Sequence, residues 1–109
     1  MTNKAMTMHD LKNLIDSMGP DEVILDVRAP AEYAEGHLPK SINIDHESVS
    51  KHVDELKKYK HVYIHCKAGG RATRAHQALA AHGLNNMVCI GSSGFDVWKN
   101  AGYPVVKGK

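Results

Sequence analysis

The chain has 109 residues, enough for one domain with a buried core and too few for two. Apolar residues make up 42% of it and charged residues 24%, which are ordinary values for a globular protein. No segment approaches the roughly 20 consecutive apolar residues of a membrane span. Residues 1–18 lack the apolar core of a signal peptide, and two cysteines are too few for a disulfide framework. We therefore expect a single cytoplasmic domain over residues 1–109 with no membrane partner.

The net charge of +2 is distributed unevenly along the chain. Residues 66–109 hold six Lys and Arg side chains against Asp96 as the only acid, whereas residues 1–65 carry a net negative charge. The second part therefore suits a small anion better than a metal cation. Its basic residues are sparse and are not interleaved with aromatic residues, which argues against nucleic acid as the partner.

The first half of the chain alternates helical and strand patterns. Thr7 followed by Asp10 predicts the start of a helix, and apolar residues recur at helical spacing over 7–18. The short apolar run at 23–27 is typical of a strand that is covered on both faces. The patterns that follow predict a short helix at 30–36, a strand at 41–44 and a helix at 48–59.

The second half continues the alternation. It predicts a strand at 61–65, a helix from Arg71 to about residue 82, a strand at 87–90 and a short helix at 95–100. This order indicates an α/β fold with a small parallel sheet of four to five strands and helices on both faces. Ligands of such folds bind at the carboxyl ends of the strands, which is where Cys66 falls.

The segment from Cys66 to Arg71 carries the strongest chemical signal. Only a thiolate is a good nucleophile, so a reactive cysteine needs a positively charged environment. A helix start after the cysteine provides partial positive charge and free N–H groups, and the two basic side chains of the segment add full charges. The glycine pair permits a backbone nest for an anion. The predicted catalytic residue is Cys66, and the predicted substrate-binding residues are Lys67, Ala68, Gly69, Gly70 and Arg71.

Each cysteine also has a purely structural interpretation, because cysteine is among the most buried residue types. For Cys66 that interpretation leaves the glycines and the basic residues of the loop unexplained. Cys89 lies inside the apolar run 87–90, and we expect it to be an inert core thiol rather than a resolving partner of Cys66.

Four segments of the chain resemble the rhodanese-like sulfurtransferase family of the single-domain type. They are Leu25-Asp26-Val27-Arg28, the segment from Glu32 to Ile44 with its Gly-His-Leu-Pro turn, His65 to Ala72, and Gly94 to Val105 with its Gly-Tyr-Pro-Val end. The four occur in the family order and span residues 25–105. The segment Gly91-Ser92-Ser93-Gly94 departs from the plain Gly-Gly that usually follows the fourth strand, and Lys67 replaces a more usual arginine.

The resemblance implies that Cys66 takes a sulfane sulfur from a donor such as thiosulfate and holds it as a persulfide. Cyanide, a small thiol or a protein acceptor would then remove that sulfur. It further implies that backbone N–H groups of residues 67–71 hold the persulfide anion and that Lys67 and Arg71 attract an anionic donor. Arg28 is expected to be structural and to pair with an acid such as Glu35. No cofactor is implied.

Three other functions remain open from the sequence. A phosphatase or arsenate reductase of the same fold has five residues between its cysteine and arginine, whereas Lys67 to Gly70 make four. A sulfur-carrier module would have the same fold and would also need the cysteine loop. A docking module would have the same fold without using Cys66. A metal site is not expected, because the eight histidines show none of the usual ligand spacings.

Overall fold

The computed structural model describes residues 4–108 and contains a five-stranded sheet. The strands are β1 (Lys4–Ala5), β2 (Glu22–Asp26), β3 (Ser41–Asn43), β4 (His61–His65) and β5 (Met87–Cys89). They lie in the spatial order β1-β5-β4-β2-β3, and every neighbouring pair is parallel. The predicted small parallel sheet is therefore confirmed, and β4 lies at its centre.

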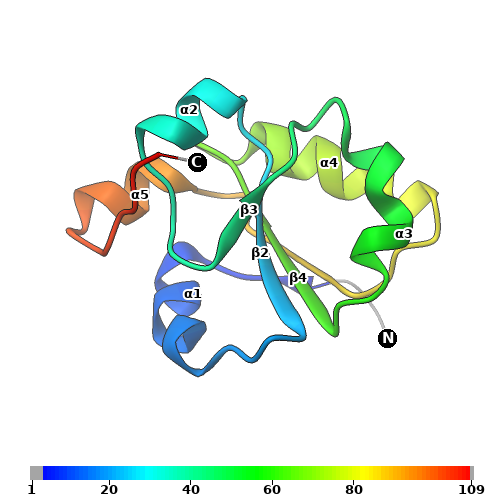
Figure 1. Ribbon diagram of the computed structural model, residues 1–109, viewed down its shortest axis with the longest axis horizontal. Helices are drawn as coiled ribbons and strands as arrows, with labels where there is room; N and C mark the ends of the chain where they lie inside the picture. The colour runs from blue at the N-terminus through cyan, green and yellow to red at the C-terminus, as the bar shows by residue number, and fades with distance from the viewer. Residues whose placement is uncertain (1–3, 109) are drawn as a thin grey trace.

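Helices cover both faces of this sheet. They are α1 (Met8–Leu14), α2 (Pro30–Glu35), α3 (Val53–Leu56), α4 (Gly70–Ala81) and α5 (Phe95–Asn100), with 3-10 turns η1 (Ile15–Ser17) and η2 (Val49–His52). In Figure 1, α1 and α5 lie on one side of the strands, and α3 and α4 lie on the other. Within residues 4–108 no helix has the length and apolar character needed to cross a membrane.

The alternation of side chains along the strands builds a separate core on each face. Val23 and Leu25 of β2 face the core under α4, where Leu79 is fully buried. Ile24, between them in the sequence, faces the other core and packs with Leu11 of α1. A strand that is apolar at every position, as β2 is over 23–25, is the pattern expected of a sheet covered on both faces.

Two differences from the predicted elements concern short segments. The strand β1 was not predicted, because a two-residue strand carries no periodicity, and it is held by its register with Val88 and Cys89 of β5. The helices predicted at 7–18 and 48–59 each divide into one 3-10 turn and one α-helix. The start of the first is as expected, with Thr7 and Asp10 forming a reciprocal capping box.

Candidate active site

The central strand places Cys66 at the carboxyl edge of the sheet. Cys66 follows β4 directly, and β4 pairs with β2 on one side and β5 on the other. Its side chain joins the core beneath α4 and is only 1% exposed. The amide of Gly69 donates a hydrogen bond to the Cys66 Sγ at 3.0 Å. A backbone N–H aimed at the sulfur stabilises negative charge there, on a thiolate or on a group attached to it.

Gly69 has the backbone conformation that makes this hydrogen bond possible. Its φ is +117°, and a Cβ at this position would lie 2.1 Å from the carbonyl oxygen of Gly91. Gly70 differs from the expected pair of turn glycines: it is the first residue of α4, has no positive φ, and has open space where a Cβ would be. Only the first glycine of the pair is therefore required by the backbone geometry.

The start of α5 packs against the backbone of the cysteine loop and is hydrogen-bonded to it. The amide of Phe95 donates to the carbonyl of Cys66 at 2.8 Å, and the amide of Asp96 donates to that of Lys67 at 3.3 Å. A Cβ on Gly94 would lie 2.2 Å from the Cys66 carbonyl oxygen, so the backbones pack together directly. The Gly-Ser-Ser-Gly segment therefore keeps a glycine at each end, where the chain contacts the loop, and places its serines between them.

The two basic residues of the loop have different environments. The guanidinium of Arg71 donates to both carboxylate oxygens of Glu32 in α2, at 2.5 and 3.0 Å. This hydrogen-bonded guanidinium lowers the pKa of Glu32 to about 2, so the pair stays charged. Lys67 is exposed and forms no ion pair with any other residue of 4–108. Of the two cations predicted to attract a donor, Lys67 is thus uncompensated, whereas Arg71 is paired with a carboxylate.

Arg28 is buried, and its partner is not the predicted one. The guanidinium binds Asp26, with the Nη2–Oδ2 distance at 2.7 Å, and not Glu35. It also donates to the carbonyl of Gly36 at 2.7 Å, which ties the end of β2 to the turn after α2 and agrees with the expected structural role. Asp26 is the nearer partner because it shares the strand face of Arg28 two residues earlier. The guanidinium lies over the Phe95 ring, 4.2 Å from its centroid.

His65 lies on the sheet face opposite Cys66, next to this ion pair. Its Nε2 is 3.9 Å from Asp26 Oδ2, and its Nδ1 lies 3.2 Å from the Cys66 carbonyl oxygen. The side chain is fully buried, and this burial lowers the pKa of His65 below the usual 6.5. A histidine that is neutral and points away from the sulfur is not placed to act as its base.

The lowered pKa of His65 makes the stability of the fold dependent on pH. Below about pH 6.5 the unfolded chain binds a proton at this residue that the folded chain does not. The contribution of the neutral His65 to the free energy of unfolding is therefore fully present above about pH 6.5, and it is lost as the pH falls below that value. We expect His65→Asn to reduce the slope of unfolding free energy against pH, between about pH 6.5 and 5, by up to about 1.4 kcal/mol per pH unit. Urea unfolding at several pH values measures this slope, and equal slopes in both proteins would contradict the assignment.

Cys89 has the environment of a core thiol. It is half-buried in β5, and burial raises the pKa of its thiol. Thr73, which contacts it from α4, also donates its hydroxyl to the carbonyl of Gly69 at 2.9 Å. Cysteines with a raised pKa are poor nucleophiles at neutral pH.

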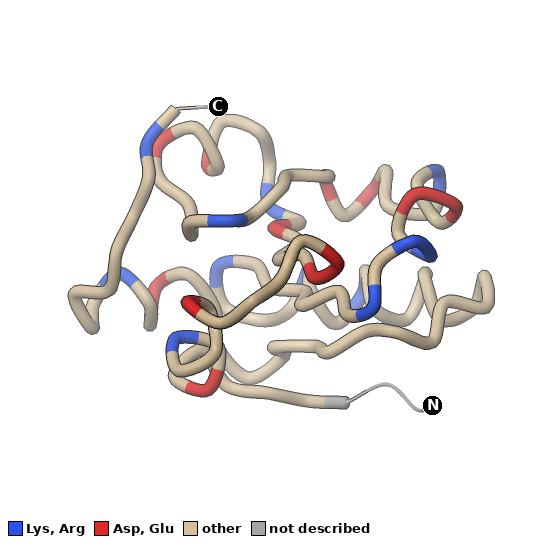
Figure 2. Tube along the Cα trace, turned by 60° about the horizontal axis from the view of Figure 1, so that its bottom comes forward, with Lys and Arg blue, Asp and Glu red and all other residues tan. Residues whose placement is uncertain are grey.

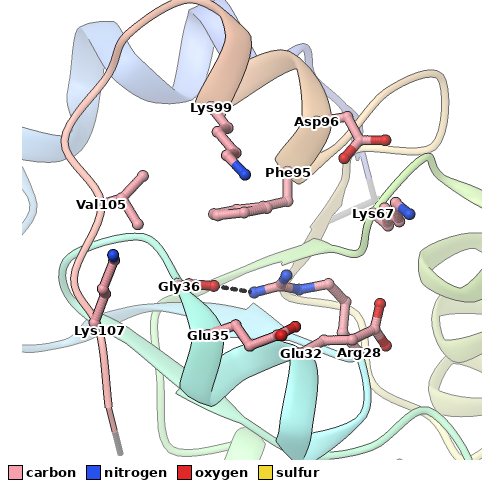
Figure 3. Close-up of a pocket in the computed structure, with 10 residues that line it drawn as sticks. All are labelled: Arg28, Glu32, Glu35, Gly36, Lys67, Phe95, Asp96, Lys99, Val105 and Lys107. Atoms are coloured by element: carbon pink, nitrogen blue, oxygen red, sulfur yellow. Dashed lines mark hydrogen bonds between the residues drawn. The ribbon is translucent and has the colours of Figure 1, made fainter.

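A cavity of about 530 Å³ opens beside the cysteine loop. It is lined by Arg28, Glu32, Glu35, Gly36, Lys67, Phe95, Asp96, Lys99, Val105 and Lys107 (Figure 3). Of these ten residues, only Lys67 was predicted from the sequence to bind substrate. The excess of basic residues after position 66 was the signal that could have added Lys99 and Lys107. In the part of the chain that the structure describes, no group of three or more His, Cys, Asp or Glu side chains could hold a metal ion.

Comparisons with known proteins agree with the fold and with the family that the sequence resembles. The sequence model of the family described as the rhodanese-like domain matches residues 7–101 of the chain. A sulfurtransferase of Allochromatium vinosum is 28% identical over 86 residues, which cover 79% of each chain. The thiosulfate:glutathione sulfurtransferase of Saccharomyces cerevisiae is 28% identical over 99 residues, covering 76% of this chain and 69% of the relative. The crystal structure of a rhodanese-related protein from Thermoplasma volcanium has a TM-score of 0.80 and 31% identity, and the match covers 94% of this chain and 97% of the other. The chain belongs to the rhodanese-like family.

Proposed function

We propose that the protein transfers the outer sulfur of thiosulfate to a small thiol through a persulfide on Cys66. The observation that carries this proposal is the hydrogen bond from the Gly69 amide to the Cys66 Sγ. It lies in a loop of four residues between Cys66 and Arg71, which suits a single sulfur atom better than a tetrahedral oxyanion. The named activity of the yeast relative is consistent with this donor and this type of acceptor.

The reaction proceeds in two steps. The Cys66 thiolate attacks the outer sulfur of thiosulfate; a new S–S bond forms, and the old one breaks with its electron pair leaving on sulfite. The Gly69 amide and the positive end of α4 stabilise the resulting persulfide anion, and Lys67 attracts the anionic donor. An acceptor thiolate then attacks the outer sulfur, and Cys66 leaves as the thiolate. Cyanide would instead leave as thiocyanate.

The intact mass of the reduced protein after incubation with thiosulfate tests this proposal. We expect the protein to gain the mass of one sulfur atom and to lose it again when cyanide is added. Cys66→Ser should gain nothing, because it lacks the nucleophile, whereas Cys89→Ser should gain sulfur as the parent does. Failure of the parent to gain sulfur from thiosulfate or polysulfide would contradict the proposal.

Two alternatives differ from this function in what they turn over. A phosphatase or arsenate reductase would leave the protein unloaded by thiosulfate and would turn over phosphate esters or arsenate. The pairing of Arg71 with Glu32 argues against this oxyanion chemistry, because the guanidinium that would bind the oxyanion is already bound to a carboxylate. A sulfur carrier would load at Cys66 but would release its sulfur to a protein faster than to any small thiol.

A further inference from the structure

The cavity beside the cysteine loop is larger than the sulfur donor requires. Its volume of about 530 Å³ lies within the range of roughly 300–1,000 Å³ that holds drug-sized molecules, whereas thiosulfate is a small inorganic ion. The cavity also adjoins the cysteine loop: Lys67 lines it, and two further lining residues, Phe95 and Asp96, are hydrogen-bonded through their amides to the carbonyls of Cys66 and Lys67. A molecule in this cavity therefore lies beside the loop that carries Cys66.

The charges that line the cavity fall into two groups. Arg28 and Glu32 already have partners, Asp26 and Arg71 respectively. The other five are Lys67, Lys99, Lys107, Glu35 and Asp96, and none of them forms an ion pair within residues 4–108. The cavity thus offers uncompensated charge of both signs, with the positive sign in excess.

These charges come from α2, the cysteine loop, α5 and the C-terminal segment, and they lie around one aromatic ring. In Figure 3, Lys67 and Lys107 lie on opposite sides of Phe95, and the Lys99 side chain points toward its ring. Lys107 is held there because the C-terminal segment pairs with α2: the amide of Gly108 donates to the carbonyl of Ala34 at 2.8 Å. Figure 2 shows positive and negative segments side by side where this segment passes α2.

We propose that this cavity is the acceptor subsite, and that it selects a zwitterionic thiol with carboxylate groups, such as a cysteine-containing small peptide. The inference rests on the sulfur transfer proposed above. The carboxylates of the acceptor would bind Lys99 and Lys107, its ammonium group would bind Glu35 or Asp96, and its thiol would reach toward Cys66. The covalent step is unchanged: the acceptor thiolate forms a bond to the outer sulfur, and the persulfide bond breaks toward Cys66. Lys99 and Lys107 thus determine specificity and take no part in the bond changes.

Rapid mixing of the sulfur-loaded protein with matched thiols tests the subsite. The probes are glutathione and mercaptosuccinate, which bear carboxylates, and 2-mercaptoethanol, which is neutral. We expect the double variant Lys99→Gln/Lys107→Gln to lose about tenfold in the discharge rate with the two carboxylated thiols. Its rate with 2-mercaptoethanol should stay within about twofold of the parent. Comparing parent and variant for one thiol at a time cancels differences in thiol reactivity. Added salt should reduce the advantage of the parent, because these charges lie near solvent.

Control measurements separate the possible failures. Lys57→Gln removes an exposed lysine next to α3, away from the cavity, and should discharge at the parent rate with every thiol. Equal losses with charged and neutral thiols, or no loss with either, would overturn the subsite while leaving sulfur transfer intact. A loss confined to loading by thiosulfate would assign the lysines to the donor and would overturn it as well. A parent protein that takes up no sulfur would instead refute the proposed function on which the subsite rests.

Discussion

Gly69→Ala is expected to slow sulfur loading at Cys66 by about 100-fold or more. The alanine Cβ would lie 2.1 Å from the carbonyl oxygen of Gly91, which is backbone and cannot rotate away. The φ of +117° is also strained for any residue with a Cβ. The loop must therefore move, and the amide that donates to the Cys66 Sγ moves with it. Removing one such donor from an anion site typically costs 10²- to 10³-fold, so about this loss is expected.

Gly70→Ala is the matched control for this variant. Gly70 begins α4 without a positive φ, and no atom lies within 4 Å of the position that its Cβ would take. We expect this variant to load sulfur at close to the parent rate and to fold at least as stably, since alanine favours helices. The initial rate of thiosulfate consumption and the loaded mass measure both variants. Normal loading of a folded Gly69→Ala protein would show that the loop conformation is not needed for the reaction.

Asp26→Asn is expected to lower the free energy of unfolding by about 3–5 kcal/mol. Asparagine keeps the shape of the side chain but removes the charge that compensates the guanidinium of Arg28. Arg28 is only 3% exposed. The asparagine amide oxygen and the Gly36 carbonyl can still accept hydrogen bonds from Arg28, but neither supplies the negative charge that a buried cation requires. For a chain of this length the midpoint of thermal unfolding should fall by on the order of 10 °C or more. Urea unfolding followed by the fluorescence of Trp98, the single tryptophan, measures the loss.

Two further variants show whether the buried charge is the cause. The double replacement Asp26→Leu/Arg28→Met removes both charges and should be more stable than Asp26→Asn, because no ion then remains buried alone. Glu55→Gln breaks the exposed pair with His52 and should cost less than about 1 kcal/mol. A loss in Asp26→Asn as small as that of Glu55→Gln would contradict the account.

Most of the sheet could be predicted from local patterns, and the exceptions have physical causes. The strands β2 and β4 are short apolar runs, and the alternation with helices indicates parallel pairing. The edge strand β1 could not be predicted, because two residues show no period and are held by β5, more than 80 positions later. The 3-10 turns η1 and η2 were missed for a similar reason, since apolar spacing does not distinguish them from the α-helical turns that follow or precede them.

The sequence by itself determined the cysteine loop and predicted Cys66 as its nucleophile. Cys66, the glycine after Ala68 and the start of α4 are neighbours along the chain, so their arrangement follows from local backbone geometry. Local sequence could not show which of the two glycines the loop requires. That requirement depends on how closely the carbonyl of Gly91, far along the chain, approaches Gly69.

Only the tertiary structure decided which charges are free to bind a substrate. Arg71 is compensated by Glu32, which lies 39 positions earlier, and Arg28 pairs with Asp26 rather than with the predicted Glu35. The cavity itself combines residues of β2's end, α2, the cysteine loop, α5 and the C-terminal segment. The pairing of a charge depends on distances across the fold, and a list of basic residues does not contain those distances. The sequence therefore indicated an anion-binding half of the chain, and the packing of the elements selected the lysines that remain unpaired within it.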